Sequence, residues 1–239
     1  MIFRGLAYFF TVSGLIFACF FLKIRVKKAT PQAAILKSCI SFCFIFTAVL
    51  CSVNSISKSA PYPLFIILAL VCGFAGDIWL DLKYVQREFE NAYTYAGLVF
   101  FLLGHIIYIC SIIYKFYVPG NFLYLFLAAL GFPAAALFIY FPSERVLKVK
   151  YGPFKLITAL YSGALFSFFT FSLYLCILTG FALKALNLVL VSSILFMISD
   201  FILCGTYFGE KKVKQSDIII NHLTYFAAQF LMAYNLLFI

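Results

Sequence analysis

Two aspartates lie inside segments that are otherwise apolar enough to cross a membrane. Asp77 lies within Val71–Leu80 and Asp200 lies within Ile194–Leu203. A carboxylate in a membrane span costs at least a few kcal/mol, so such residues usually face a polar cavity and serve a function. Two carboxyl groups in different surroundings can act as a general acid and as the partner of a cation or a water molecule. The alternative is a structural hydrogen bond between helices.

Other polar side chains in the apolar segments are candidates for positioning these carboxyl groups or for binding a substrate. They are His105, Tyr108, Tyr161, Ser199, Tyr225 and Gln229. At 1.5 Å per residue, both aspartates lie roughly 8 Å inside the same membrane boundary, and the span that carries Tyr225 starts from that side. We therefore expect one pocket that opens toward the cytoplasm. His222, which is nearer to the end of its span, is expected at the membrane interface.

The composition predicts the elements that must position these residues. The chain has 239 residues, of which 65% are hydrophobic and 11% are charged, and its mean hydropathy is +1.08. A soluble domain of this size could not bury so much apolar surface. We therefore expect residues 1–239 to form a single all-α transmembrane domain, a polytopic bundle of about eight membrane-spanning helices. The expected spans are roughly 5–22, 35–52, 62–82, 93–114, 120–141, 154–177, 182–205 and 218–238.

The distribution of positive charge predicts the orientation of the spans. Most of the 18 Lys and Arg residues fall in or beside every second connection, beginning with Lys23–Lys28. This bias places those connections in the cytoplasm and both termini outside the cell or in the lumen. The expected location is the cell membrane of a bacterium or the endoplasmic reticulum of a eukaryote. The net charge of +10 follows from the same bias, so no nucleic-acid partner is expected.

Two short sequence patterns occur twice in the chain, which is compatible with a two-fold repeat of four spans each. A small residue followed by Asp and, three residues later, Leu occurs at Gly76–Leu80 and again at Ser199–Leu203. A His-x-x-Tyr pattern follows in the next span each time, at His105 and at His222. Halves with an even number of spans have the same orientation, so an axis along the membrane normal would relate them.

Metal and thiol chemistry have little support in the sequence. The chain has two histidines and no HxxxH or HExxH pattern, so we expect no metal and no cofactor. The eight cysteines lie within or at the edge of spans without a CxxC pair, as is typical of packing residues. Asp81 and Lys83, near the end of a span, are expected to form a solvated pair.

Four segments together resemble the YhhN/TMEM86 family of lysoplasmalogenases. They are Phe74–Leu80 (FAGDIWL), Phe101–Tyr108 (FLLGHIIY), Ile194–Leu203 (ILFMISDFIL) and Thr224–Leu231 (TYFAAQFL). Their order and spacing and the expected eight-span layout are similar to those of the family, and the resemblance covers most of the chain. Asp77, His105, Asp200, Tyr225 and Gln229 match positions of the family motifs, whereas His222 does not.

The resemblance implies hydrolysis of the vinyl ether bond of a lysoplasmalogen, a lysophospholipid delivered by the bilayer. The products would be a fatty aldehyde and glycerophosphoethanolamine or glycerophosphocholine. Vinyl ethers are opened by acid, which agrees with a catalytic role for Asp77 and Asp200. The cations expected to meet the phosphate are Lys83, Arg87, Lys211 and Lys212. The rival hypotheses are a proton-coupled transporter of a lipid or small molecule with the two aspartates as relay sites, and a membrane scaffold without enzymatic activity.

Overall fold

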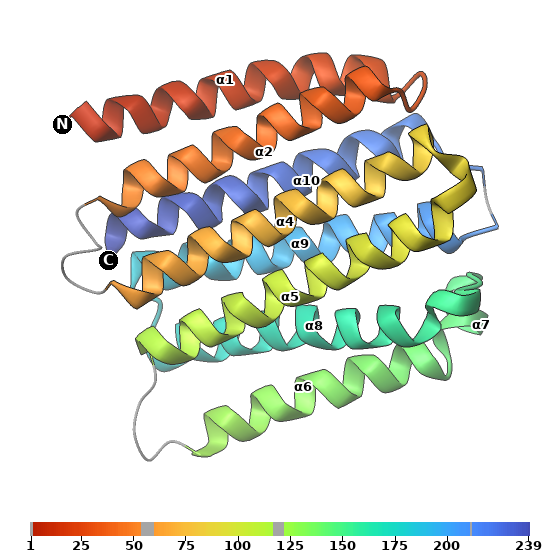
Figure 1. The fold of residues 1–239 in the computed structure, drawn as a ribbon. Coiled ribbons are helices and arrows are strands. Elements are labelled where there is room, and N and C mark those ends of the chain that lie inside the picture. The colour runs from red at the N-terminus through yellow and green to blue at the C-terminus, as the bar shows by residue number, and fades with distance from the viewer. Residues whose placement is uncertain (1, 54–59, 117–121, 211) are drawn as a thin grey trace.

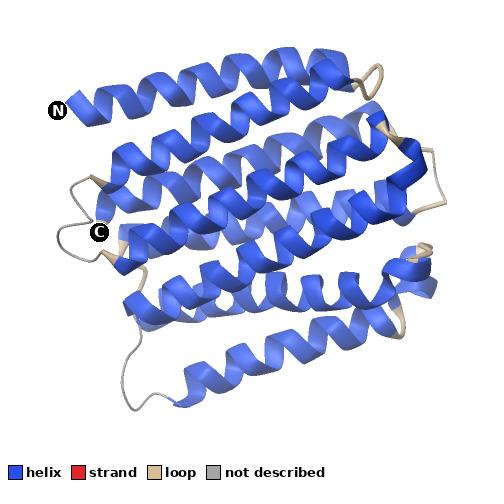
Figure 2. Ribbon diagram, viewed as in Figure 1, coloured by secondary structure: helices blue, strands red, loops and turns tan. Residues whose placement is uncertain are grey.

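The computed structural model describes residues 2–53, 60–116, 122–210 and 212–239, and within these residues eight long helices account for most of the chain (Figures 1 and 2). The helices are α1 (Ile2–Arg25), α2 (Pro31–Ser52), α4 (Pro61–Val85), α5 (Glu90–Phe116), α6 (Phe122–Tyr140), α8 (Lys155–Leu178), α9 (Lys184–Phe208) and α10 (Gln215–Tyr234). A short helix, α7 (Ser143–Leu147), lies in the connection between α6 and α8. The prediction of an all-helical membrane bundle is confirmed.

Several helices extend beyond the spans predicted from hydropathy. α1 continues to Arg25, α4 to Val85 and α9 to Phe208. The added turns contain charged or amphipathic side chains, which lower a hydropathy average without interrupting a helix. The buried face of α10, like those of α2 and α4, is partly polar and carries Asn221, Tyr225 and Gln229.

Six of the helices form a closed ring, and the other two lie outside it. α2, α4, α5, α8, α9 and α10 pack each against the next, and α10 closes the ring against α2. α1 packs on the outer side of α2, and α6 packs on the outer side of α8, so these two helices form opposite edges of the bundle (Figure 1). The order of pairing is therefore the same in the first four and the last four long helices, as a two-fold repeat requires.

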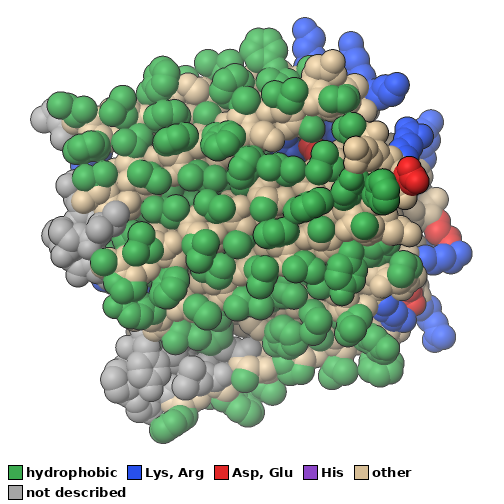
Figure 3. All heavy atoms as spheres, in the orientation of Figure 1, with side chains coloured by type: hydrophobic (Ala, Val, Ile, Leu, Met, Phe, Trp, Pro, Cys, Tyr) green, Lys and Arg blue, Asp and Glu red, His purple; other side chains and the backbone are tan. Residues whose placement is uncertain are grey.

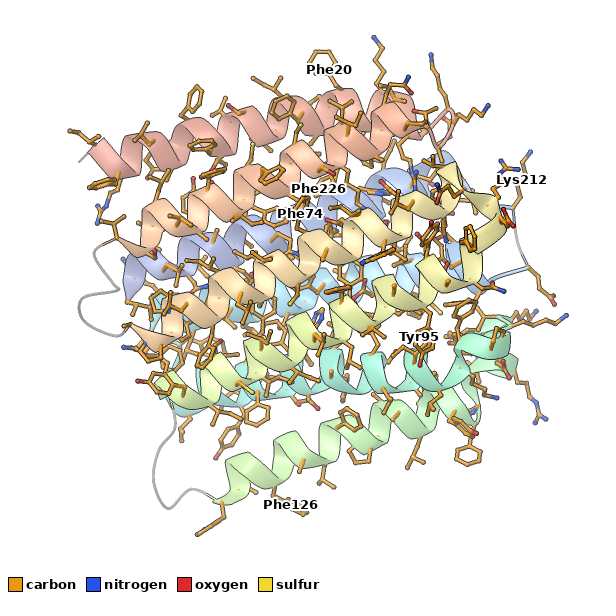
Figure 4. The ribbon with its side chains drawn as sticks, viewed as in Figure 1. Phe20, Phe74, Tyr95, Phe126, Lys212 and Phe226 are labelled. Carbon is orange, nitrogen blue, oxygen red and sulfur yellow. The ribbon has the colours of Figure 1, made fainter. Side chains whose placement is uncertain are left out.

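The flank of the bundle is apolar, and the positive charge gathers at one end. Figure 3 shows hydrophobic side chains over the visible flank and Lys and Arg side chains at the end that holds the α1–α2, α4–α5, α6–α8 and α9–α10 connections. Phe20 on α1 and Phe126 on α6 point away from the bundle, whereas Lys212 lies at its basic end (Figure 4). An apolar belt with one basic end is the distribution expected of a protein that spans a bilayer.

The basic end is predicted to face the cytoplasm. A cysteine introduced for Arg145, exposed on α7, should remain unlabelled by a membrane-impermeant maleimide in intact cells and should react after the cells are opened. The matched variant is Lys184→Cys, exposed at the opposite end, which should react in intact cells. Labelling of the Arg145→Cys protein alone in intact cells would reverse the proposed orientation.

Candidate active site

The carboxyl group of Asp77 is at the centre of a buried polar cluster. Its side chain is nearly inaccessible, at 2% exposure, and its Oδ1 atom lies 3.0 Å from the Nζ atom of Lys37 on α2. The other oxygen, Oδ2, accepts hydrogen bonds from the hydroxyl groups of Ser41 at 3.0 Å and of Tyr225 at 2.8 Å. Both oxygens therefore have partners, and the adjacent ammonium group favours the charged carboxylate.

A second carboxylate, Asp81, extends this cluster toward the basic end. Residues four apart share one face of a helix, so Asp77 and Asp81 both face α2. Asp81 lies 3.2 Å from the guanidinium group of Arg25 and 3.9 Å from the ammonium group of Lys37. The prediction of a solvated Asp81–Lys83 pair is wrong, because both side chains are buried and Lys83 instead lies over the ring of Tyr207, 3.3 Å from its centroid. The positive charges of Arg25 and Lys37 thus compensate the negative charges of Asp77 and Asp81 inside the bundle.

A chain of hydrogen bonds links Asp77 to the middle of the bundle. The hydroxyl group of Tyr108 donates to Oε1 of Gln229 at 3.0 Å, and Nε2 of Gln229 donates to the hydroxyl oxygen of Tyr225 at 2.9 Å. Tyr225 in turn donates to Asp77. A Cβ atom at Gly73 would lie 2.5 Å from Nε2 of Gln229, so only glycine leaves room for this amide beside α4. The chain holds the hydroxyl group of Tyr225 in position against the carboxylate.

Asp200 has different surroundings from Asp77. It is half-buried on α9, and its Oδ2 atom accepts a hydrogen bond from the hydroxyl group of Tyr161 on α8. Among the described residues it forms no ion pair with Lys, Arg or His. A carboxyl group inside a membrane span without a cationic partner is more stable in its uncharged form.

Both carboxyl groups line one cavity at the basic end of the bundle. The cavity has a volume of about 290 Å³ and is bounded by α1, α2, α4, α5, α9 and α10 and by the α1–α2 and α9–α10 connections. Asp77 and Asp200 each lie eight residues before the end of their helix, at Val85 and Phe208, which is about 12 Å along the axis. The cavity is lined by cations as well as by carboxyl groups, namely Arg25, Lys27, Lys28 and Lys37.

The other predicted site residues occupy two places. Tyr225 and Ser199 line the cavity, and the side-chain amide of Asn221 donates to the carbonyl and hydroxyl oxygens of Ser199 at 2.7 and 3.1 Å. His105, Tyr108, Tyr161 and Gln229 instead line a small void of about 10 Å³ deeper in the bundle, together with Tyr225. The Nδ1 atom of His105 lies 2.9 Å from the carbonyl oxygen of Phe101, whereas its buried Nε2 atom has no hydrogen-bond partner among the described residues.

The histidine expected at the interface lies inside the bundle. His222 is buried, its ring centroid lies 4.8 Å from that of Phe21, and it lines the cavity that contains both aspartates. The interfacial prediction is wrong because α10 begins at Gln215, so that His222 lies two turns inside the helix on the face that also carries Tyr225. Its Nδ1 atom lies 2.8 Å from the carbonyl oxygen of Ile218, an arrangement similar to that of His105 in α5.

The three described cations that were expected to meet a phosphate are not among the residues that line this cavity. Lys83 lines a separate surface cavity of about 220 Å³ with Glu90 and Lys150, and Arg87 and Lys212 are exposed in connections at the basic end. Lys211 lies outside the described residues. The cations that do line the cavity come from α1, α2 and the connection between them. Arg25 is the last residue of α1, Lys37 lies about two turns inside α2, and both contact Asp81.

The described cysteine and histidine side chains form no cluster of the kind that binds metals. All eight cysteines are free, and no group of three or more His, Cys, Asp or Glu residues within the described ranges could hold a metal ion. The expectation that the protein has no tightly bound metal stays a prediction.

The chain matches the model of a known protein family. The model of the YhhN family matches residues 32–236, which is most of the chain. The comparisons with curated proteins and with solved structures gave no match.

Removal of Lys37 should destabilise the protein more than joint removal of Lys37 and Asp77. Lys37→Met leaves a buried carboxylate without its cation, which should lower the free energy of unfolding by about 3–5 kcal/mol. The Lys37→Met/Asp77→Asn double variant should recover much of that loss, because no unpaired charge remains at this position. Thermal unfolding of the purified proteins in detergent measures both effects. A Lys37→Met variant that melts with the wild type would show that the pair is not a buried ionic contact.

Proposed function

The chain belongs to the YhhN family, and we propose that it is an intramembrane hydrolase that opens the vinyl ether bond of lysoplasmalogens. The observation that carries the proposal is that Asp77 and Asp200 line one cavity although their surroundings differ. One carboxyl group is paired with an ammonium group, and the other has only a tyrosine hydroxyl as its partner among the described residues. Two such groups suit the acid-catalysed opening of a vinyl ether, because one can deliver the proton and the other, as an anion, can stabilise the cation that forms.

The reaction follows from the electronic structure of the substrate. A vinyl ether, R–CH=CH–O–R′, resists base but accepts a proton at the alkene carbon that is remote from oxygen. The electron pair of the double bond forms the new C–H bond and leaves an oxocarbenium ion at the carbon attached to oxygen. Water adds to that carbon and loses a proton to a carboxylate, and the resulting hemiacetal collapses to an aldehyde and the alcohol R′OH. The proton that is donated in the first step is thereby recovered.

Asp200 is assigned the role of the acid. It has no cationic partner among the described residues, so it can hold a proton that a buried ion pair would expel. The hydroxyl group of Tyr161 fixes one oxygen of the carboxyl group, and the other oxygen, which accepts no hydrogen bond from the described residues, can face the substrate. Once Asp200 has given up its proton, it becomes the carboxylate that receives the proton of the attacking water.

Asp77 is assigned the role of the permanent anion. Lys37 holds it in the charged form, and Ser41 and Tyr225 fix its orientation. A fixed carboxylate near the developing oxocarbenium ion lowers the energy of the transition state, because it needs no reorganisation as the charge forms. Tyr225 lines the cavity and can also orient the water molecule, since its position is set by Gln229.

The cations that line the cavity suit the polar end of a lysophospholipid. Lys27 and Lys28 are in the α1–α2 connection and border the cavity, with Arg25 just inside. They supply charge-assisted hydrogen bonds for a phosphate group at the cytoplasmic entrance. We assign phosphate binding to these residues in preference to Lys83, Arg87 and Lys212, which do not line the cavity.

Replacement of either aspartate by asparagine should abolish most of the activity. Asparagine keeps the size of the side chain but can neither transfer a proton nor carry a negative charge, so Asp200→Asn and Asp77→Asn should each reduce aldehyde release by roughly a hundredfold or more. The double variant should be little worse than the poorer single variant, because the two groups act as a unit. The measurement is fatty-aldehyde release from a lysoplasmalogen by the purified protein in detergent.

A matched control and a rival outcome accompany this experiment. Glu88→Gln changes an exposed carboxylate at the same end of the bundle and should keep wild-type activity. Near-normal turnover in both folded aspartate variants would show that the carboxylate mechanism is wrong. A transporter that uses the aspartates as relay sites would release no aldehyde in detergent but would move its cargo between the two compartments of a vesicle.

A further inference from the structure

A second cavity lies between the outer helix α6 and the helices α8 and α9. It has a volume of about 210 Å³, and its walls are mostly apolar side chains, among them Ala135 and Phe138 of α6, Leu165 and Phe166 of α8, and Met197 of α9. Among the described residues no Lys or Arg lines it, and its one acidic residue is Asp200. A cavity of this composition suits a hydrocarbon group rather than a charged one.

The apolar cavity meets the polar cavity at the proposed acid. Asp200, Leu203 and Tyr207 line both cavities. On the polar side of these three residues lie Arg25, Lys27, Lys28 and Lys37, and on the other side lie mainly aromatic and aliphatic groups. The arrangement therefore has a cationic side, an apolar side and a carboxyl group between them.

We infer that the apolar cavity binds the alkyl chain of a lysophospholipid whose phosphate lies in the polar cavity. The inference rests on the proposed function and adds to it the direction in which the substrate lies. In this placement the bond between the glycerol and the chain passes beside Asp200. The carboxyl group then reaches the first carbon atoms of the chain, which are the atoms that a vinyl ether must present to an acid.

The dimensions of the cavity favour one chain. Along α9 its lining runs from Phe208 to Met197, which is eleven residues or about 16 Å. The volume is below the usual range for ligand pockets, so a second chain of similar length would not fit beside the first. A single-chain amphiphile is therefore the occupant that the two joined cavities match.

The position of α6 provides a route for the chain. α6 packs on α8 at the edge of the bundle and supplies Ala135, Phe138 and Ile139 to the wall of the cavity (Figure 1). A chain that enters from the bilayer beside α6 reaches the cavity without leaving an apolar environment, while its phosphate stays at the basic end.

Protection of a native cysteine tests occupancy without any turnover. Cys204 lines the apolar cavity, whereas Cys39 on α2 lines neither of the two cavities. The probe is a saturated 1-O-alkyl lysophosphocholine, which carries the headgroup and the chain but no cleavable double bond. It should slow alkylation of Cys204 by N-ethylmaleimide severalfold and leave the rate at Cys39 unchanged, as measured by peptide mass spectrometry. Equal rates at Cys204 with and without the probe, or equal protection by a diacyl phosphatidylcholine, would overturn the inference.

A pair of neighbouring substitutions on α6 tests the location of the chain. Ala135 lines the cavity and Ala134 is exposed on the outer face of α6. Ala135→Phe should weaken binding of a long-chain 1-O-alkyl lysophosphocholine by about tenfold and that of a short-chain homologue much less, because the added ring fills the cavity. Ala134→Phe should bind both probes as the wild type does. Equal effects of the two substitutions would contradict the inference, and since the probes are not cleaved, a failure of the proposed activity would leave this result unaffected.

Discussion

A charge inside a bilayer must be compensated by an opposite charge. The Lys37–Asp77 ion pair meets this requirement inside the bundle. The pair joins α2 to α4, and through Asp81 it also draws in Arg25 at the end of α1. Each group alone would cost several kcal/mol in an apolar interior, whereas together they offset most of that cost. The same pair favours the charged form of Asp77, so a packing constraint and a chemical property have one physical cause. Asp200 lacks such a partner among the described residues, and the contrast between the two carboxyl groups follows from that difference.

The sequence predicted the elements of the fold well because membrane spans carry a strong signal. Every predicted span overlaps a long helix, and the cations gather at one end as their distribution along the chain indicated. Asp77 and Asp200 could be predicted as site residues because a carboxylate is rare and energetically costly in an apolar segment. Tyr225 and Ser199 share their cavity, and Tyr161 contacts Asp200, as their positions in neighbouring spans suggested.

Most of the missed residues share a different feature, because they lie toward the ends of spans. Lys37, Arg25 and Asp81 resembled the solvated flanks of their helices, since hydropathy averages cannot tell a flank from an inward-facing terminal turn. The i, i+4 spacing of Asp77 and Asp81 was a usable signal, because it places two carboxyl groups on one face that then requires cations. His222 was missed for the same reason, since the start of α10 at Gln215 could not be located from hydropathy alone. Which cations border the cavity depends on how α1 and α2 pack, and no local pattern contains that information.

The central claim is that the two carboxyl groups differ in charge within one cavity. Infrared spectroscopy of the purified protein in lipid at neutral pH tests it directly, because a protonated carboxyl group and a carboxylate absorb at separate frequencies. The account predicts a carbonyl band of a protonated acid that disappears in Asp200→Asn and persists in Asp77→Asn, with loss of carboxylate absorption in Asp77→Asn only. A protonated band that disappears in Asp77→Asn, or none at all in the wild type, would contradict the account.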